Sequence, residues 1–301
     1  MKYGLFLGCN MPTIRPDVER AIRLTMPPLG VELVDLEGIA CCPAFGTFPS
    51  ADEMASLSVT AWNLSIAEQA GVDLIVECGS CYSSLKEGRD ALVKHPDKMK
   101  KANELLRVAG KEFEGKAVPY HITDVLYNVV GVERIREAAG NILEGVKVVV
   151  QYPCHTLWPS SVVGFDDPGR PHILRELVEA LGAEVQSFSR EFQCCGGAGG
   201  FVHRSRPDAV EFVKKKFDSI KAETEAQLMV VSCITCLMHL DNMQGSLSKG
   251  DNKYSLPVLD YNQVLALCMG FDPKEVASIS NVPRDGIIEY ISAGRHQALT
   301  V

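Results

Sequence analysis

The sequence predicts an α/β protein made of two similar halves, each containing a mostly parallel sheet. Three observations support this prediction. Short apolar segments rich in β-branched residues recur along the chain, longer segments with helix-start signals separate them, and one cysteine pattern occurs twice. The 301 residues are enough for one large domain or two of ordinary size. We place the first repeat at residues 1–143 and the second at residues 144–301, related by an approximate twofold axis.

Eight short segments are predicted to be strands, four in each half. In the first half they cover residues 3–7, 31–35, 73–77 and 119–121. In the second half they cover residues 146–152, 184–188, 228–232 and 257–259. Nearly continuous apolar runs of this kind are typical of strands buried on both faces of a parallel sheet, joined by right-handed crossovers. Each half is therefore predicted to be Rossmann-like.

Two of the intervening helices carry recognisable start signals. Ser50 and Glu53 have the spacing of a capping box for a helix over residues 53–70, which Gly71 ends. Ser205 with Asp208 predicts the start of a second helix that extends to about residue 222.

The cysteines follow one order in both halves: a single cysteine, a vicinal pair and a CxxC motif. The single cysteine and the pair are 32 positions apart in one half and 40 in the other (41 − 9 and 194 − 154). The pair and the CxxC motif are 36 and 38 positions apart (78 − 42 and 233 − 195). Five matched positions indicate an internal repeat. The ten cysteines are Cys9, Cys41, Cys42, Cys78, Cys81, Cys154, Cys194, Cys195, Cys233 and Cys236.

These cysteines are candidate metal ligands. The single cysteines and the CxxC motifs follow predicted strands, and ligands of open α/β sheets bind at the carboxyl ends of the strands. Turn signals follow both vicinal pairs, Pro43 in one half and Gly196–Gly200 in the other, so neighbouring cysteines can reach one site. Iron–sulfur clusters and structural zinc both take four cysteines, whereas each half offers five. Two clusters are favoured, while two zinc sites, zinc with one cluster, and a disulfide framework remain open.

Composition narrows the class of protein. The net charge is −8 and the basic residues are scattered, which argues against a nucleic-acid binder. The apolar run at the start is too short for a signal peptide, and no run approaches the roughly 18 residues of a membrane span. Eleven cysteines in a chain with these features indicate metal or redox chemistry in a reducing compartment, so we expect a cytoplasmic location.

The motifs resemble those of the cysteine-rich, or CCG, domain family. Residues 194–199 read Cys-Cys-Gly-Gly-Ala-Gly and residues 232–236 read Ser-Cys-Ile-Thr-Cys, whereas the first half has Cys-Cys-Pro at residues 41–43. Nearly the whole chain is similar to the B-type subunit of the CoB–CoM heterodisulfide reductase of methanogens. That resemblance implies two non-cubane [4Fe–4S] clusters, held by the ten repeat cysteines. It also implies reduction of CoM-S-S-CoB to CoM-SH and CoB-SH in methanogenesis, with each cluster delivering one electron and trapping one thiolate.

Other members of the family leave alternatives open. Glycolate-type and glycerol-phosphate dehydrogenase subunits usually add a C-x-x-C-x-x-C segment, which this sequence lacks. Lactate-utilisation proteins also lack it, so an electron-transfer subunit of a lactate or glycolate dehydrogenase is the main alternative, with a zinc-plus-cluster scaffold as another. The sequence shows no nicotinamide or flavin fingerprint. Electrons are expected from a ferredoxin-like iron–sulfur subunit of the C type and a flavin-containing subunit of the A type with a hydrogenase or formate dehydrogenase.

Several residues outside the cysteine sets are considered for roles in catalysis, substrate binding or packing. His155 adjoins Cys154 and is a candidate proton donor to a leaving thiolate, the alternative being only a hydrogen bond to a cluster sulfide. His203 and Arg204 follow the glycine loop and are candidates to bind a substrate's sulfonate and phosphate groups, the alternative, which the sequence favours slightly, being a solvated helix start. The run Lys214–Lys216 is predicted to be a solvated helix face, and Cys268 a small buried hydrophobe.

Overall fold

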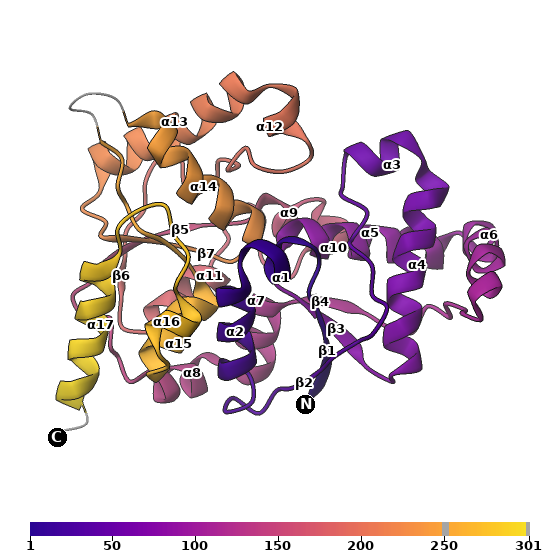
Figure 1. Cartoon of the computed structure of the whole chain (residues 1–301), viewed down its shortest axis with the longest axis horizontal. Helices are drawn as coiled ribbons and strands as arrows, with labels where there is room; N and C mark the ends of the chain where they lie inside the picture. The colour runs from indigo at the N-terminus through magenta and orange to yellow at the C-terminus, as the bar shows by residue number, and fades with distance from the viewer. Residues whose placement is uncertain (249–252, 299–301) are drawn as a thin grey trace.

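The computed structural model describes residues 1–248 and 253–298, and it has the predicted α/β architecture. Two four-stranded sheets lie side by side in the described chain (Figure 1), with strand orders β2-β1-β3-β4 and β6-β5-β7-β8. Every strand pair is parallel. The second order repeats the first with each number raised by four, so the two halves share one topology.

The strands match the predicted segments to within a few residues. Those of the first sheet are β1 (Lys2–Phe6), β2 (Glu32–Val34), β3 (Asp73–Val76) and β4 (Pro119–His121). Those of the second are β5 (Lys147–Gln151), β6 (Glu184–Val185), β7 (Leu228–Val231) and β8 (Val258–Asp260). The central strands β3 and β7 are almost wholly buried, as their apolar sequences require.

Helices fill the connections of the first half. They are α1 (Asn10–Ile14), α2 (Pro16–Thr25), α3 (Thr47–Ala51), α4 (Glu53–Gln69), α5 (Gly79–Lys94), α6 (Pro96–Leu106), the 3-10 turn η1 (Arg107–Ala109), α7 (Ile122–Asp124), the π-helical turn η2 (Val125–Val130) and α8 (Val132–Ala139).

The second half follows the same plan. Its helices are α9 (Cys154–Leu157), α10 (Ser160–Val163), α11 (Ile173–Glu179), α12 (Phe201–Arg204), α13 (Arg206–Glu223), α14 (Ile234–Leu247), α15 (Tyr261–Met269), α16 (Pro273–Val276) and α17 (Asp285–Ala298). In the described parts of the chain, no helix is both long and apolar enough to cross a membrane.

The two predicted helix starts are right in position, but the capping box at Ser50 is wrong. Asp52 is the N-cap of α4 and accepts a hydrogen bond from the backbone amide of Ala55 at 2.9 Å. Ser50 lies inside the separate helix α3, so its hydroxyl donates instead to the carbonyl of Gly46, four residues earlier. Ser205 is the N-cap of α13, where its hydroxyl donates to the carboxylate of Asp208.

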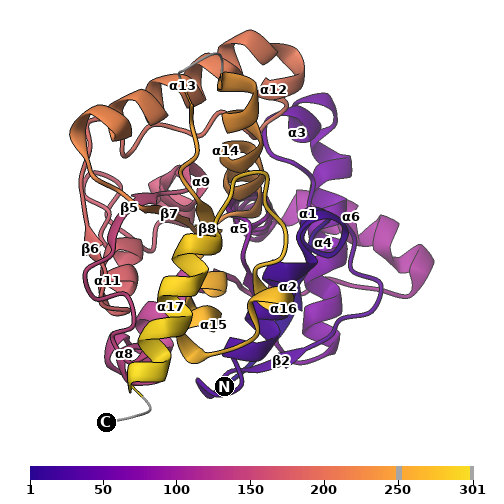
Figure 2. The ribbon, with the colours of Figure 1, turned by 60° about the vertical axis from the view of Figure 1, so that its left-hand side comes forward.

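The halves exchange helix partners across the pseudo-twofold axis. Helix α2 of the first half packs against α15 of the second, and α11 of the second packs against α7 of the first. Near the predicted site, α1 contacts α14 while α9 contacts α5, and α5 and α14 contact each other. Figure 2 shows α2 beside α15 and α16. Because each half covers apolar surface of the other, one buried cluster contains residues from both sheets.

A buried polar network joins the halves on this interface. Arg15 donates two hydrogen bonds to Asp17, at 3.0 and 3.1 Å, and both side chains are almost completely buried. Asp17 also accepts from the Gln263 amide nitrogen at 2.8 Å.

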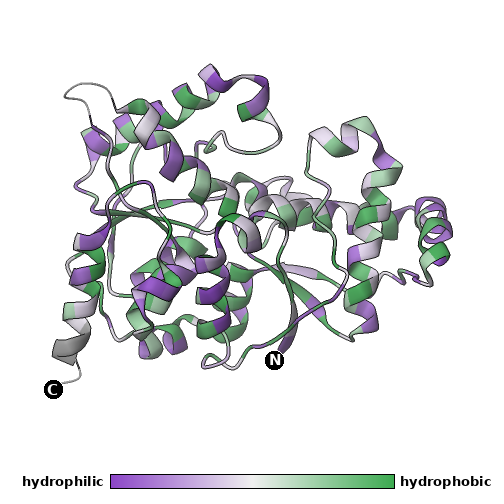
Figure 3. Ribbon diagram, in the orientation of Figure 1, coloured by the Kyte–Doolittle hydropathy of each residue, from purple (hydrophilic) through white to green (hydrophobic). Residues whose placement is uncertain are grey.

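Figure 3 shows how hydropathy is distributed over the fold, with apolar residues concentrated in the strands and hydrophilic ones on outer helices such as α6 and α13. The boundary between residues 143 and 144, which falls between α8 and β5, stays a prediction.

Candidate metal centre

The parallel sheets bring the single cysteine and the first cysteine of the CxxC motif in each half to the carboxyl ends of their central strands. Cys9 follows β1 and is the N-cap of α1, while Cys78 follows β3 and is the N-cap of α5. In the second half Cys154 is the first residue of α9, and Cys233 follows β7 as the N-cap of α14. The thiols therefore lie at helix starts, where backbone amides and the helix dipole favour negative charge.

The ten sulfurs form one connected series. The Sγ atoms are 3.1 Å apart for Cys42 and Cys81 and 3.3 Å apart for Cys195 and Cys236. Cys41 interacts with both Cys9 and Cys42, and the two cysteines of each CxxC motif interact with each other. Cys194 lies 3.7 Å from Cys154 and also interacts with Cys195. None of these ten cysteines, all within the described residues, forms a disulfide.

The two sets meet at Cys78 and Cys233, whose Sγ atoms are 3.8 Å apart. These residues are equivalent in the two repeats, so their contact marks where the pseudo-twofold axis crosses the site. Gly79 makes the approach possible, because a Cβ there would lie 3.0 Å from Pro153 Cβ and 3.7 Å from the Cys233 sulfur. Gly8 acts similarly within the first half: it has φ +63°, and a Cβ would lie 3.2 Å from the Cys81 sulfur.

The thiols share hydrogen bonds in which one sulfur is stabilised as the thiolate and its neighbour retains a proton. A hydrogen bond from Cys41, then one from Cys81, lowers the pKa of Cys42 to about 5. Hydrogen bonds from Cys154 and Cys195 lower the pKa of Cys194 to about 2, and the interaction with Cys194 raises the pKa of Cys195 to about 12. Thiolates with lowered pKa values are the form that binds metal.

The backbone around the two vicinal pairs differs. The amide of Gly196 donates to the Cys194 sulfur at 3.3 Å, and the amide of Gly197 donates to the Cys195 sulfur at 3.4 Å. The residue two positions after Cys41 is Pro43, which has no backbone N–H to donate. The substitution of proline for glycine in the first repeat therefore removes one N–H···S hydrogen bond.

The donor set fits a polynuclear iron–sulfur group. Each half supplies five thiols in a row of sulfur neighbours, whereas among the described residues no three His, Cys, Asp or Glu side chains are arranged to hold a single metal ion. A cluster contains several irons and can therefore bind sulfurs spread along such a row. The ligand roles of the ten cysteines remain a prediction that this arrangement supports.

A cavity of about 100 Å³ lies against the thiols, and both halves line it. Phe45, Gly79 and Ser80 come from the first half, and the second half supplies Pro153, Cys154, His155, Cys194, Cys195, Ala198, Cys233, Thr235 and Cys236. A molecule in this cavity would contact the cysteines of the second set, and it would reach the first half at Gly79 and Ser80, the residues between Cys78 and Cys81. Sequence reasoning placed the cysteines here but missed Phe45, since nothing in its local sequence distinguishes it from a packing residue.

His155 faces this cavity and is held by partners from the first half. Its ring lies on that of Phe45, with centroids 3.4 Å apart, and its Nδ1 is 3.1 Å from the hydroxyl of Ser83. Ser83 in turn donates to the carboxylate of Glu87. Burial lowers the pKa of His155 below its ordinary value, while Glu87 and nearby thiolates act in the opposite direction. Ser83 and Glu87 were not identified from the sequence, because their link to His155 depends on packing between the halves.

The two other predicted site residues lie elsewhere. His203 and Arg204 are exposed on the short helix α12 and are not among the residues that line the cavity. Their role in substrate binding stays a prediction. Cys268 is buried in α15, as expected.

The lysine run is only partly as predicted. Lys214 is partly exposed and Lys215 is exposed, whereas Lys216 is completely buried. The expectation of a solvated face is wrong for Lys216, because this residue lies three positions after Val213 and four before Ile220, on the inward stripe of α13.

Two buried carboxyl groups adjoin the axis. Glu77 precedes Cys78 and accepts a hydrogen bond from the backbone amide of Ile234 at 3.1 Å, while Asp260 ends β8. Burial, then the neighbouring Asp260 carboxylate, raises the pKa of Glu77 well above its ordinary value, so Glu77 carries the proton shared by the pair. Glu77 thereby links the end of β3 to the start of α14.

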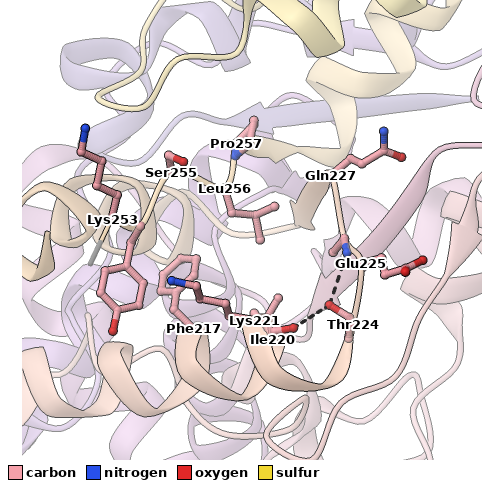
Figure 4. Close-up of a pocket in the computed structure, with 12 residues that line it drawn as sticks. Phe217, Ile220, Lys221, Thr224, Glu225, Gln227, Lys253, Ser255, Leu256 and Pro257 are labelled. Carbon is pink, nitrogen blue, oxygen red and sulfur yellow. Dashed lines mark hydrogen bonds between the residues drawn. The ribbon is translucent and has the colours of Figure 1, made fainter. Parts of the chain in front are cut away.

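A larger hollow lies away from the thiols. It has a volume of about 480 Å³ and is lined by residues of α13 and by those that precede β7 and β8. Figure 4 shows Phe217, Ile220 and Leu256 in it, with the Thr224 hydroxyl hydrogen-bonded to the Ile220 carbonyl. Because it opens at the amino ends of the strands and no cysteine lines it, this hollow is separate from the candidate centre.

Comparison with known proteins identifies the family. The model of the cysteine-rich domain (CCG) matches residues 3–86 and 148–241. A protein of Archaeoglobus profundus that is described as like the B-type subunit of heterodisulfide reductase is 46% identical over 97% of this chain and 98% of its own. The B-type subunit of the ferredoxin:CoB-CoM heterodisulfide reductase of Methanosarcina mazei is 33% identical over 97% of this chain and 99% of its own.

More distant matches are consistent with this assignment. A lactate utilization protein A of Bacillus velezensis is 25% identical over 83% of this chain and 94% of its own. A crystal structure of a hypothetical protein from Helicobacter pylori has the same fold, with a TM-score of 0.68 at 13% identity. That alignment covers 94% of this chain and 52% of the other, so this chain spans about half of that protein.

The fold and the doubled cysteine sets define a tandem cysteine-rich domain protein of the oxidoreductase class. The chain belongs to the CCG-domain family and, within it, to the group of B-type heterodisulfide reductase subunits. It is thus an iron–sulfur electron-transfer subunit of an oxidoreductase complex, as the family and the clustered cysteines together indicate.

Proposed function

We propose that this chain is the subunit that reduces the heterodisulfide CoM-S-S-CoB to CoM-SH and CoB-SH in methanogenesis. The observation that carries the proposal is the meeting of the two cysteine sets at Cys78 and Cys233, next to a cavity that both halves line. A disulfide has two sulfurs that must each receive one electron and one proton. Two thiol sets that meet at one point suit that symmetric demand. The Methanosarcina mazei relative is a subunit of a CoB-CoM heterodisulfide reductase and the Archaeoglobus profundus relative is described as like a heterodisulfide reductase subunit, which supports the same reaction.

The cofactors of this proposal are two non-cubane [4Fe–4S] clusters, one for each half. Cys9, Cys41, Cys42, Cys78 and Cys81 would hold the first, and Cys154, Cys194, Cys195, Cys233 and Cys236 the second. When bound, the clusters would supply one-electron transfers and an iron site for each product sulfur. The chain itself contributes the thiolates, whose lowered pKa values at Cys42 and Cys194 prepare them to bind metal.

His155 is proposed as the proton donor. It lines the cavity, and its hydrogen-bond partner Ser83 connects it to Glu87. Glu87 also lines a second, open hollow on the first half, so the series Glu87–Ser83–His155 runs from that hollow to the thiol cavity. Phe45 fixes the His155 ring from the other face. His203 and Arg204, which are exposed on helix α12 and do not line the cavity, remain proposed partners for the anionic ends of the substrate.

The electron donors are proposed to be a ferredoxin-like iron–sulfur subunit of the C type and a flavin-containing subunit of the A type with a hydrogenase or formate dehydrogenase, in the cytoplasm. Cys9 and Cys41 are solvent-exposed, so the first cysteine set lies where a docked donor can approach it. Electron transfer between proteins depends on such close approach.

The experiment that tests the proposal is EPR of the anaerobically purified chain with and without CoM-S-S-CoB. A disulfide in the cavity would lie against the second cysteine set, next to its Cys78–Cys233 contact with the first set, so the heterodisulfide or one of its thiols should produce a new paramagnetic signal. Lactate should not. An unchanged spectrum at saturating heterodisulfide, together with lactate-dependent reduction in the presence of a partner, would replace this proposal with the lactate-type electron-transfer subunit that the weaker relatives favour.

A further inference from the structure

The buried lysine of helix α13 lies beside the second cysteine set. Lys216 Nζ donates to the carbonyl of Arg190 at 2.5 Å and to that of Glu191 at 3.2 Å, and it lies 5.2 Å from the centroid of the Phe188 ring. These carbonyls precede Cys194 by only a few residues. Lys216 is 0% exposed, so its charge is screened by protein groups and not by water.

The charge state of this lysine follows from two opposing effects. Burial lowers the pKa of Lys216 to about 8, while the nearby cysteines Cys195, Cys236 and Cys194 act to raise it. The ammonium form therefore predominates at neutral pH. The Cys194 thiolate and the lysine stabilise each other, because opposite charges attract strongly where water is excluded.

The first half has no equivalent charge at the matching position. Lys216 precedes the CxxC cysteine Cys233 by 17 residues (233 − 216), and the residue 17 before Cys78 (78 − 61) is Ala61, a fully buried apolar residue. The CxxC helices α5 and α14 begin at the same place in both sets, so their dipoles do not distinguish the halves. The Glu77–Asp260 pair lies at the axis between the two sets.

We propose that Lys216 raises the reduction potential of the iron–sulfur centre held by the second-half cysteines. This inference rests on the proposed function, since it requires a cluster at that site. Reduction adds negative charge to a cluster, and a fixed positive charge in a dry environment stabilises the reduced form. The amides of Gly196 and Gly197 act in the same direction on the same set, and the first half has a proline in place of the first of them.

Solvent raises the potential of the first centre as well, because water around the exposed Cys9 and Cys41 also stabilises the reduced state. The difference in potential between the two centres therefore does not report on Lys216 alone. The contribution of Lys216 must therefore be measured within the second half. A Cys42→Ala chain retains only the second set intact, and a Cys195→Ala chain retains only the first. These two parent chains separate the centres.

The test is an EPR-monitored redox titration of Lys216→Gln and Lys216→Arg in the Cys42→Ala chain. Glutamine retains a donor for the two carbonyls without the charge, whereas arginine retains the charge. We expect Lys216→Gln to raise the ratio of oxidised to reduced centre at a given potential at least tenfold. This change corresponds to a reduction potential lowered by about 59 mV for one electron. We expect Lys216→Arg to change this ratio less than threefold. Lys215→Gln is the matched control, because Lys215 carries the same charge one residue away but is exposed.

The outcomes separate this inference from the proposed function. An unchanged potential in Lys216→Gln, an equal shift in Lys215→Gln, or a shift of the first centre in the Cys195→Ala chain would overturn it. Loss of iron from both Lys216 variants would assign the residue a packing role and overturn it as well. Loss of iron from the glutamine variant alone supports it, since an anionic centre then needs the cation.

If the Cys42→Ala parent binds no iron, the same comparison is made in the otherwise unchanged chain, where one of two titration steps should shift. If the unchanged chain itself binds no iron, the proposed function fails and this inference fails with it.

Discussion

Asp17 provides the sharpest test of how the two halves are held together. Its carboxylate accepts two hydrogen bonds from Arg15, one from Gln263 at 2.8 Å and one from the backbone amide of Ile279 at 3.2 Å. Asp17→Ala removes all four and leaves the Arg15 guanidinium buried without its counter-charge. Breaking a buried ion pair in this way costs about 3–5 kcal/mol. We expect a loss of that size in the free energy of unfolding.

Glu275 supplies the control. It forms an ion pair with Arg20 at 2.8 Å that also joins α2 to α16, but both side chains are about half exposed, at 50% and 49%. Exposed pairs contribute about 0–1 kcal/mol, so Glu275→Ala should cost less than about 1 kcal/mol. Both variants remove a carboxylate that connects α2 to the second half of the chain, and the two carboxylates differ mainly in burial.

Urea unfolding of the anaerobic, iron-loaded chain measures both changes, with intrinsic fluorescence and circular dichroism as independent probes. The midpoints can be compared only if the free energy of unfolding falls with urea concentration at the same rate in each variant. A loss below about 1 kcal/mol for Asp17→Ala, or one no larger than that of Glu275→Ala, would refute the reasoning that burial makes this network important.

Four further predictions concern metal, electrons and pH. Metal analysis should find about eight irons per chain and no stoichiometric zinc, because ten cysteines form two equal sets and each [4Fe–4S] group holds four irons; about four irons with one zinc would favour the zinc-plus-cluster alternative. Cys268→Ala should retain all the iron while Cys195→Ala and Cys81→Ala lose about half, and iron loss in the Cys268 variant would show a wrong ligand set. The purified chain should accept no electrons from NADH but should accept them from a one-electron donor, and turnover with NADH alone would contradict this. His121 is fully buried, and burial lowers its pKa to about 4 from an ordinary value of 6.5. The unfolded chain therefore binds the extra proton at a higher pH than the folded chain does, so the free energy of unfolding falls as the pH drops below 6.5. Urea unfolding should show a loss of about 2 kcal/mol by pH 5, and this loss should be absent in His121→Gln.

Most of the fold was predictable because its signals are local. Strands such as residues 73–76 and 228–231 are apolar runs that only a doubly covered sheet accommodates, and the repeat of the cysteine order fixed their equivalence. The cap of α4 was misassigned because Ser50 and Asp52 both precede the helix. The choice between them depends on α3, a short helix that interrupts the approach and takes up the Ser50 hydroxyl.

The site was predictable only as far as cysteine spacing extends. The partners of His155 come from the other half, so no local pattern connects Ser83 or Phe45 with it. Lys216 was misread for a different reason. A run of three lysines suggests a solvated face, but it spans about 200° of a helix, so whether all three face solvent depends on where the inward stripe lies. The positions of Val213 and Ile220 relative to Lys216 contained the missing information.

The repeated topology has a consequence for how such a protein can evolve. A single repeat that paired with a copy of itself would be a symmetric homodimer, in which any change on one side of the axis appears on the other. Two centres in that ancestor would necessarily have the same potential. Joining the copies in one chain removes the constraint. The first vicinal pair is then free to be followed by Pro43 where the second is followed by Gly196, and Ala61 is free to occupy the position that matches Lys216. Gene fusion thus permits two electron carriers of different reduction potential in one chain, where strict symmetry allows only two carriers of equal potential.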